Sequence, residues 1–112
     1  MDQDVASLLA LDRLIHEPSR LVLMALLAPI ESADFLFLLR QTRMTKGNLS
    51  SHLMRLEEGG YVAVKKTYQG KTPQTIYRLT QEGRAAWEEY QQRLRRFIDA
   101  ASGTGGLVPE PG

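Results

Sequence analysis

The sequence contains no cysteine, which excludes disulfides, thiolate zinc sites and cysteine nucleophiles. It also lacks a long hydrophobic run: the longest, Leu21 to Ile30, reaches about half the length that a membrane span needs. The first residues include Asp2 and Asp4 but no basic start, so we expect no signal peptide. The 112 residues can bury one modest core. We therefore expect a single soluble, cytoplasmic domain that makes no contact with a membrane.

Residues suited to catalysis or metal binding are scarce. The only histidines are His16 and His52, and no cluster of His, Asp and Glu has the spacing of metal ligands. The glycines form no phosphate-binding loop pattern. We interpret His52, at the edge of a leucine stripe, as a packing or capping residue, and His16 as a tether of the first helix to the core. The sequence thus predicts no enzyme, no metal and no cofactor.

Charge is balanced over the whole chain but not along it. The chain has 14 Lys and Arg against 13 Asp and Glu. Between Arg40 and Arg78 there are 8 basic residues and 2 acidic ones, Glu57 and Glu58, so this segment carries a net charge of +6. The remaining residues carry −5. A basic middle between acidic ends indicates a surface for a polyanion such as nucleic acid, with ordinary solvated charge as the alternative.

Hydrophobic periodicity predicts five helices and two strands, in the order α-α-α-α-β-β-α. The helices are expected at residues 2–15, 18–28, 33–41, 46–58 and 81–100, and the strands at 61–67 and 75–79. Ser32, Thr45 and Thr80 are expected helix caps, and Gly59-Gly60 ends the fourth helix in a left-handed conformation. The fold class is therefore α+β, mainly α, with one domain over residues 1–100. Residues 101–112, rich in Gly and Pro, are expected to be a disordered tail.

Two short helices joined by a tight turn, followed by a hairpin, describe a winged helix-turn-helix. In the DNA-binding version the second helix lies in the major groove. Leu49, Leu53 and Leu56 form the stripe that would hold this helix on the core. Lys and Arg can read guanine there, and Asn can read adenine. The residues that we expect at double-stranded DNA are Arg43, Thr45, Lys46, Asn48, Ser50, Ser51 and Arg55 from the turn and helix, and Lys65, Lys66, Lys71, Thr72 and Gln74 from the hairpin, or wing.

Several segments together resemble a known family. They are Leu11-Asp-Arg-Leu-Ile-His-Glu-Pro-Ser-Arg-Leu21, Gly47-Asn-Leu-Ser-Ser-His-Leu53, Leu56-Glu-Glu-Gly-Gly-Tyr-Val62 and Tyr77-Arg-Leu-Thr-Gln-Glu-Gly83. Over Leu8 to Ile98 the chain resembles small prokaryotic winged-helix transcriptional regulators related to the MarR and ArsR groups. The resemblance implies a homodimeric, repressor-type DNA binder. Thr45 to Arg55 would match the recognition helix, and Gln69 to Gln74 would match the wing.

Two features depart from those groups. The acidic-x-Arg wing signature of MarR proteins is missing, since the tip reads Gln69-Gly-Lys-Thr72. The cysteine motif of metal-sensing ArsR proteins is absent as well. A small-molecule effector is compatible with the resemblance, but neither group's ligand can be transferred to this chain.

We expect the terminal helices to form a homodimer interface. The residues that would make it are Val5, Leu8 and Leu9 from the first helix and Trp87, Tyr90, Leu94, Phe97 and Ile98 from the last. Together they would make a large exposed apolar patch on a monomer. One alternative is that the last helix folds back on its own hairpin. Another is that the winged helix docks on proteins and binds no specific DNA.

Overall fold

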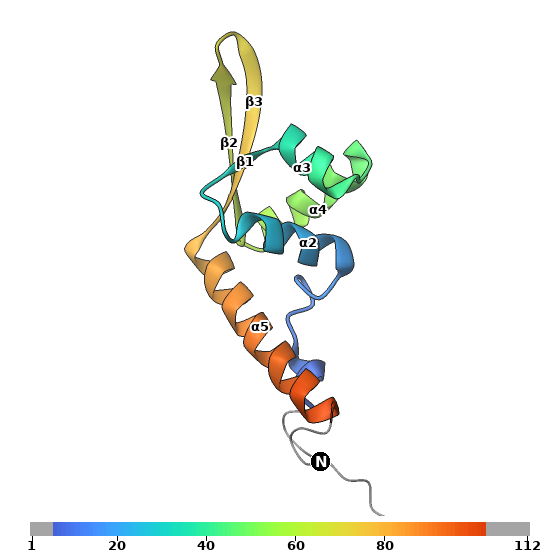
Figure 1. Ribbon diagram of the computed structural model, residues 1–112. Helices are drawn as coiled ribbons and strands as arrows, with labels where there is room; N and C mark the ends of the chain where they lie inside the picture. Colours follow the sequence, from blue (N-terminus) through green and yellow to red (C-terminus); the bar gives the residue numbers. More distant parts are fainter. Residues whose placement is uncertain (1–5, 103–112) are drawn as a thin grey trace, which may run out of the picture.

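The computed structural model describes residues 6–102. Its elements, in chain order, are the 3-10 helix η1 (Ser7–Ala10), α2 (Pro18–Leu27), β1 (Ala33–Asp34), α3 (Phe35–Thr42), α4 (Lys46–Glu58), β2 (Val62–Gln69), β3 (Thr72–Leu79) and α5 (Gln81–Ala101). The strands form an antiparallel sheet in the order β1-β3-β2. Figure 1 shows α2, α3 and α4 grouped beside the inner half of the hairpin, while its outer half and α5 project in opposite directions. This is a winged-helix arrangement, and the predicted fold class is confirmed.

Capping residues fix where the main helices begin and end. Thr45 Oγ1 accepts a hydrogen bond from the Asn48 N–H at 3.2 Å, and Thr80 Oγ1 accepts one from the Gly83 N–H at 2.9 Å. Both caps were predicted, and α4 and α5 start directly after them. Gly60 has φ +84°, so the chain leaves α4 through a left-handed residue that glycine adopts without strain.

The predicted helix over residues 2–15 was wrong for its described part. Of residues 6–15, Ala6 is α-helical and Ser7–Ala10 form a 3-10 turn, while residues 11–15 are not helical. Asp12 Oδ1 accepts hydrogen bonds from the N–H groups of Leu14 and Ile15, at 2.9 and 3.4 Å, and its other carboxylate oxygen accepts the Tyr61 hydroxyl. These bonds favour a turn over a continued helix. Burial, with the bond to Asp12, raises the pKa of Tyr61 to about 12, so the phenol stays a neutral donor.

Three further boundaries differ from the prediction. Ser32 does not cap α3; Ala33–Asp34 pairs with β3 instead, and Asp34 Oδ1 accepts the Phe37 N–H at 2.7 Å, so α3 begins at Phe35. The strands are longer than expected, because a two-residue turn with Gly70 at φ +64° closes the hairpin, and most of residues 68–74, which were expected to lie outside the strands, are paired. Helix α5 includes Ala101, and the rest of the expected tail, apart from Ser102, lies outside the described residues.

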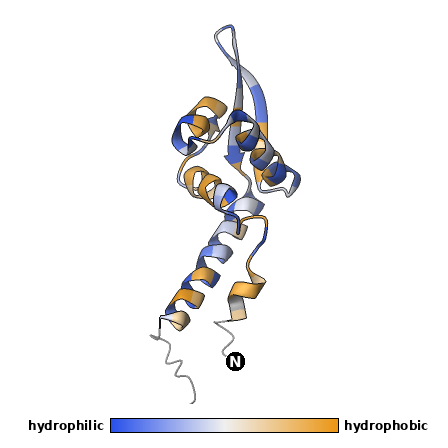
Figure 2. Cartoon of the chain, turned by 90° about the vertical axis from the view of Figure 1, so that its right-hand side faces the viewer, coloured by the Kyte–Doolittle hydropathy of each residue, from blue (hydrophilic) through white to orange (hydrophobic). Residues whose placement is uncertain are grey.

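The core lies where the three short helices meet the inner half of the sheet. The predicted stripe of Leu49, Leu53 and Leu56 is confirmed, since each is at most 1% exposed. The other fully enclosed side chains are Ile15, Leu23, Met24, Leu27, Leu38 and Tyr90. Burying one such leucine contributes about 1.5–3 kcal/mol, so this stripe holds α4 firmly on the domain. In Figure 2 the outer end of the hairpin is pale to blue, which is consistent with its having no core of its own.

Helix α5 extends away from the hairpin, with η1 alongside it (Figure 1). The alternative in which the last helix folds back on its own hairpin is therefore wrong. Tyr90 is only 2% exposed, and its hydroxyl lies 2.8 Å from His16 Nδ1. It belongs to the chain's own core and is not available to a dimer interface, which corrects that part of the prediction. His16 was expected to tether the first helix to the core; it contacts α5 through this bond, but residues 11–16 form no helix, so the expected tether of a helix is not confirmed.

None of the helices between residues 6 and 102 is long and hydrophobic enough to cross a membrane.

Candidate nucleic-acid interface

Helix α4 presents one exposed surface opposite its leucine stripe. All the residues predicted to read DNA from this helix and its cap are exposed, namely Thr45, Lys46, Asn48, Ser50, Ser51 and Arg55. The first carboxylate on the helix is Glu57, in the last turn. From Lys46 to Arg55 the surface therefore offers cations, an amide and hydroxyls with no acid among them. Such groups can donate to base edges and phosphates.

The turn between α3 and α4 is tight and locally bonded. Arg43 has φ +57°, an unusual left-handed conformation for a residue with a side chain, and its N–H donates to the Leu39 carbonyl at 3.0 Å. Thr42 Oγ1 donates to the Leu38 carbonyl at 2.8 Å and accepts the Met44 N–H at 3.3 Å. The turn thus fixes the start of α4 relative to α3 and leaves the predicted DNA contact Arg43 exposed.

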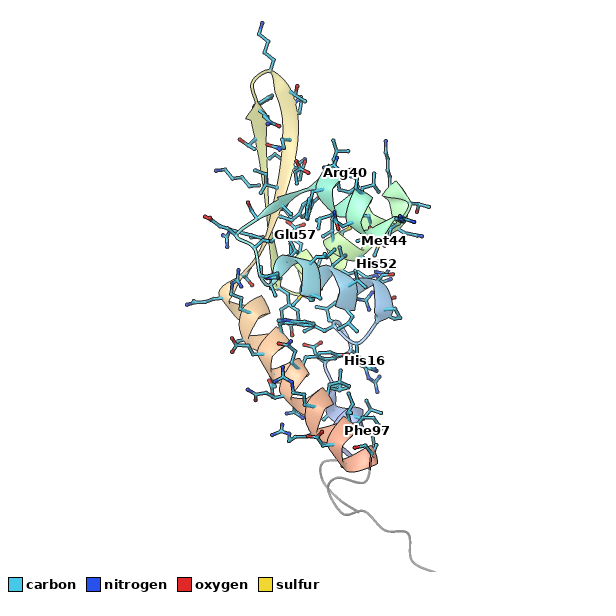
Figure 3. All side chains as sticks on the ribbon, viewed as in Figure 1. His16, Arg40, Met44, His52, Glu57 and Phe97 are labelled. Carbon is cyan, nitrogen blue, oxygen red and sulfur yellow. The ribbon has the colours of Figure 1, made fainter. Side chains whose placement is uncertain are left out.

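A buried cation joins α4 to the segment before α2. Arg20 is 8% exposed; its Nε donates to the Leu14 carbonyl at 2.6 Å, and its Nη1 lies 3.1 Å from His52 Nδ1 on α4. Because the guanidinium can only donate, this His52 nitrogen is the acceptor. Glu17 Oε2 accepts the Arg20 N–H at 2.9 Å and caps α2. His52 thus has a structural partner, in agreement with the packing role predicted for it; Figure 3 labels both histidines.

The wing has two faces, because side chains alternate along each strand. One face carries, in pairs across the strands, Val62 and Leu79, Val64 and Tyr77, Lys66 and Thr75, and Tyr68 and Pro73. The Tyr77 ring lies 6.4 Å from the ring of Phe35 on α3, centroid to centroid, so this face turns toward the helices. We call it the inner wing face.

The strand register separates two residues that the sequence analysis grouped together. Lys66 lies on the inner wing face, while Lys65 pairs with Ile76 on the opposite face. Lys65 instead lines a cavity of about 310 Å³ with Arg78 and Glu31. The register therefore places Lys66, and not Lys65, on the side of α4.

Gln74 connects the wing to α3. Its Nε2 donates to Asp34 Oδ2 at 3.0 Å. The hydrogen bond from the Phe37 N–H holds the pKa of Asp34 below its usual value. The hydrogen bond from Gln74 and the positive charge of Arg40 lower this pKa further. The predicted DNA contact Gln74 is thus already engaged in holding the wing. Lys71 and Thr72 at the tip are exposed.

A groove separates α3 and α4 from the wing. Its volume is about 490 Å³, and its lining includes Leu36, Ser50, Pro73 and Thr75. Sequence reasoning missed two exposed apolar side chains near it: Leu36 is 58% exposed, and Tyr68 on the wing is 70% exposed. Tyr68 lies two residues after Lys66 in one strand, and this spacing is the sequence signal that would have placed both on the same face of the wing.

Within residues 6–102 no three His, Asp or Glu side chains come together as metal ligands do.

Comparison with known proteins agrees with this geometry. The family described as winged helix DNA-binding domain matches residues 19–98, from the first turn of α2 almost to the end of α5. The chain belongs to this family. The chain is also 35% identical over 78 residues to an uncharacterized protein of Methanocaldococcus jannaschii. The aligned part covers 70% of this chain and 85% of that protein.

Solved structures share the winged-helix fold over most of their length. A transcriptional regulator homologue from Pyrococcus horikoshii OT3 has a TM-score of 0.81 and 26% identity, with 89% of this chain and 98% of that chain covered. A protein of Enterococcus faecalis V583 described as a MarR-family regulator has a TM-score of 0.72 and 24% identity, with 96% of each chain covered; it shows the fold alone. The family match and the shared fold confirm the expectation of a small winged-helix regulator of the DNA-binding type.

Proposed function

We propose that this winged-helix protein is a sequence-specific regulator of repressor type that binds double-stranded DNA. The observation that carries the proposal is the exposed surface of α4, which is free of carboxylates from Lys46 to Arg55 and is held on the core by three buried leucines. Helix α4 would enter the major groove, where Asn48 and Arg55 can read adenine and guanine. Lys66 and Lys71 on the wing would contact the adjacent backbone or minor groove. The protein acts by binding, without catalysis or a cofactor.

We further propose that the protein acts as a homodimer through η1 and α5. Leu9 is 83% exposed and Ile98 is 52% exposed, and Leu94 packs partly against the chain's core. Figure 3 places Phe97 near the end of α5 farthest from the hairpin. The predicted interface residue Val5 lies outside the described residues. Two-fold pairing of η1 and α5 with those of a second copy would cover this apolar surface. It would also set two α4 helices about one DNA turn apart, so the operator would be roughly palindromic.

The first prediction concerns the salt dependence of DNA binding. Purified protein should select a small set of fragments from genomic DNA. Its affinity for them should fall about 10³-fold or more between 50 and 200 mM salt, because a dimer that contacts six or more phosphates releases counterions. Fluorescence anisotropy against salt concentration measures the slope. If no fragment binds at low salt, or if binding is insensitive to salt, the protein-docking alternative replaces the proposal.

The second prediction separates residues that read bases from those that hold the backbone. Asn48→Ala and Arg55→Ala should each cost about 1–3 kcal/mol on the selected site and much less on random DNA, because they remove base contacts. Lys71→Ala should weaken both DNAs equally and lower the salt slope by about one unit. Competition titrations with the two DNAs measure this. If Lys71→Ala alone abolished the sequence preference, the two roles would have to be exchanged.

A further inference from the structure

The outer half of the wing carries an exposed aromatic ring that the proposed function leaves without a role. Tyr68 is 70% exposed on the inner wing face, opposite Pro73 and two residues from Lys66. Figure 3 shows side chains standing out from the outer half of the hairpin. No core is available there, so the ring is not placed to stabilise the fold by burial.

The surroundings of Tyr68 combine apolar surface with positive charge. A shallow cavity of about 180 Å³ next to the ring is lined by Lys66, Thr67, Tyr68, Pro73, Gln74 and Thr75, none of them acidic. Tyr68 and Pro73 are its apolar residues, and Lys66 is its basic residue. An apolar surface edged by a cation fits a deoxyribose and its phosphate, whereas a protein partner would require a broader apolar area.

The geometry of the domain decides which part of DNA would meet this surface. The inner wing face looks across the groove at Ser50 of α4, because Ser50, Pro73 and Thr75 line the same space. With α4 in the major groove, the next groove that the projecting hairpin can reach is the minor groove. That groove is only about 6 Å wide, so it admits side chains from a hairpin tip but no helix.

We propose that Tyr68 and Pro73 pack on the deoxyribose wall of the minor groove beside the site read by α4, with Lys66 on the adjoining phosphate. This rests on the proposed function and adds to it a contact that is apolar and independent of sequence. A sugar contact releases no counterion, so its contribution does not depend on salt, unlike that of the wing lysines. The two kinds of contact can therefore be separated by titration.

The test compares Tyr68→Thr with Tyr68→Phe in the full chain. Threonine keeps the strand preference but removes the ring, so the hairpin is retained. Tyr68→Thr should weaken binding to the selected DNA about tenfold, by the same factor at every salt concentration, whereas Tyr68→Phe should bind like the wild type. Lys71→Ala is the matched control, since it should change the slope. Hydroxyl-radical footprinting should show deoxyribose protection beside the α4 site that is lost only in Tyr68→Thr.

Three results would overturn the inference. Wild-type affinity for Tyr68→Thr would show that the ring makes no contact, and a reduced salt slope would show that it acts through the lysines. An unchanged footprint would place the ring outside the minor groove. In each of these cases DNA binding by the wild type leaves the proposed function standing. Failure of the wild type to bind any DNA would overturn both.

Discussion

Ile98→Asp should convert the proposed dimer to a monomer and weaken binding to the full operator by about 10²- to 10⁴-fold. The side chain is 52% exposed in the single chain, so a carboxylate there costs the monomer little. In a dimer interface the same carboxylate would be buried without a partner, which is strongly unfavourable. The loss of affinity follows because two linked recognition helices bind with a high effective concentration that a monomer lacks.

The controls for this variant lie on α5 and η1. Gln92→Asp introduces the same charge at an exposed position on another side of α5 and should remain dimeric. Leu9→Asp, at 83% exposure on η1, should reproduce the effect of Ile98→Asp. Leu94→Asp is less informative, because Leu94 packs partly on the chain's own core. Light scattering gives the mass, and anisotropy with full and half operators gives the affinities. A wild type that is monomeric at micromolar concentration and still binds tightly would contradict the dimer.

Local signals were sufficient to predict the two helices that carry the proposed base contacts and part of the proposed dimer interface. The period of Leu49, Leu53 and Leu56, with Thr45 as cap, placed α4 within its actual bounds. Thr80 and the apolar stripe placed α5 almost as well. Each of these signals lies within one element, where helix periodicity and capping act.

The sequence could not reveal features that depend on pairing between distant residues. Asp12 holds a turn and accepts the Tyr61 hydroxyl, 49 residues away, where periodicity alone predicted a helix. The strand β1 has only two residues and exists because Ala33 pairs with Tyr77. Which wing lysine faces α4 depends on the β2–β3 register, so the sequence alone could not separate Lys65 from Lys66. Tyr90 matched the pattern of a surface stripe, yet its side chain is buried in the core and its hydroxyl contacts His16.

Gly83→Ala should be strongly destabilising, with a loss of about 2 kcal/mol and a fall in Tm of about 10 °C. A Cβ at Gly83 would lie 2.2 Å from the Tyr61 carbonyl oxygen and 3.0 Å from the Tyr61 Cα, and both are backbone atoms that cannot turn aside. The same carbonyl accepts the Thr80 N–H at 3.0 Å, and Thr80 Oγ1 donates to the Gly60 carbonyl at 2.6 Å. The extra methyl would therefore force the start of α5 away from Tyr61 and weaken the hydrogen bonds that fix α5 on the domain.

Gly47→Ala is the matched control for Gly83→Ala. It should make the protein more stable and at the same time weaken its binding to DNA. Gly47 lies in the first turn of α4, and a Cβ there would meet nothing within 4 Å, so alanine should raise the free energy of unfolding by about 0.5–1 kcal/mol. The same methyl would stand on the surface of α4 that is proposed to approach DNA, so this more stable variant should bind the selected DNA more weakly. Thermal denaturation and anisotropy on both variants check this pair. Destabilisation by Gly47→Ala, or a Gly83→Ala variant as stable as the wild type, would contradict the packing described for these two helix starts.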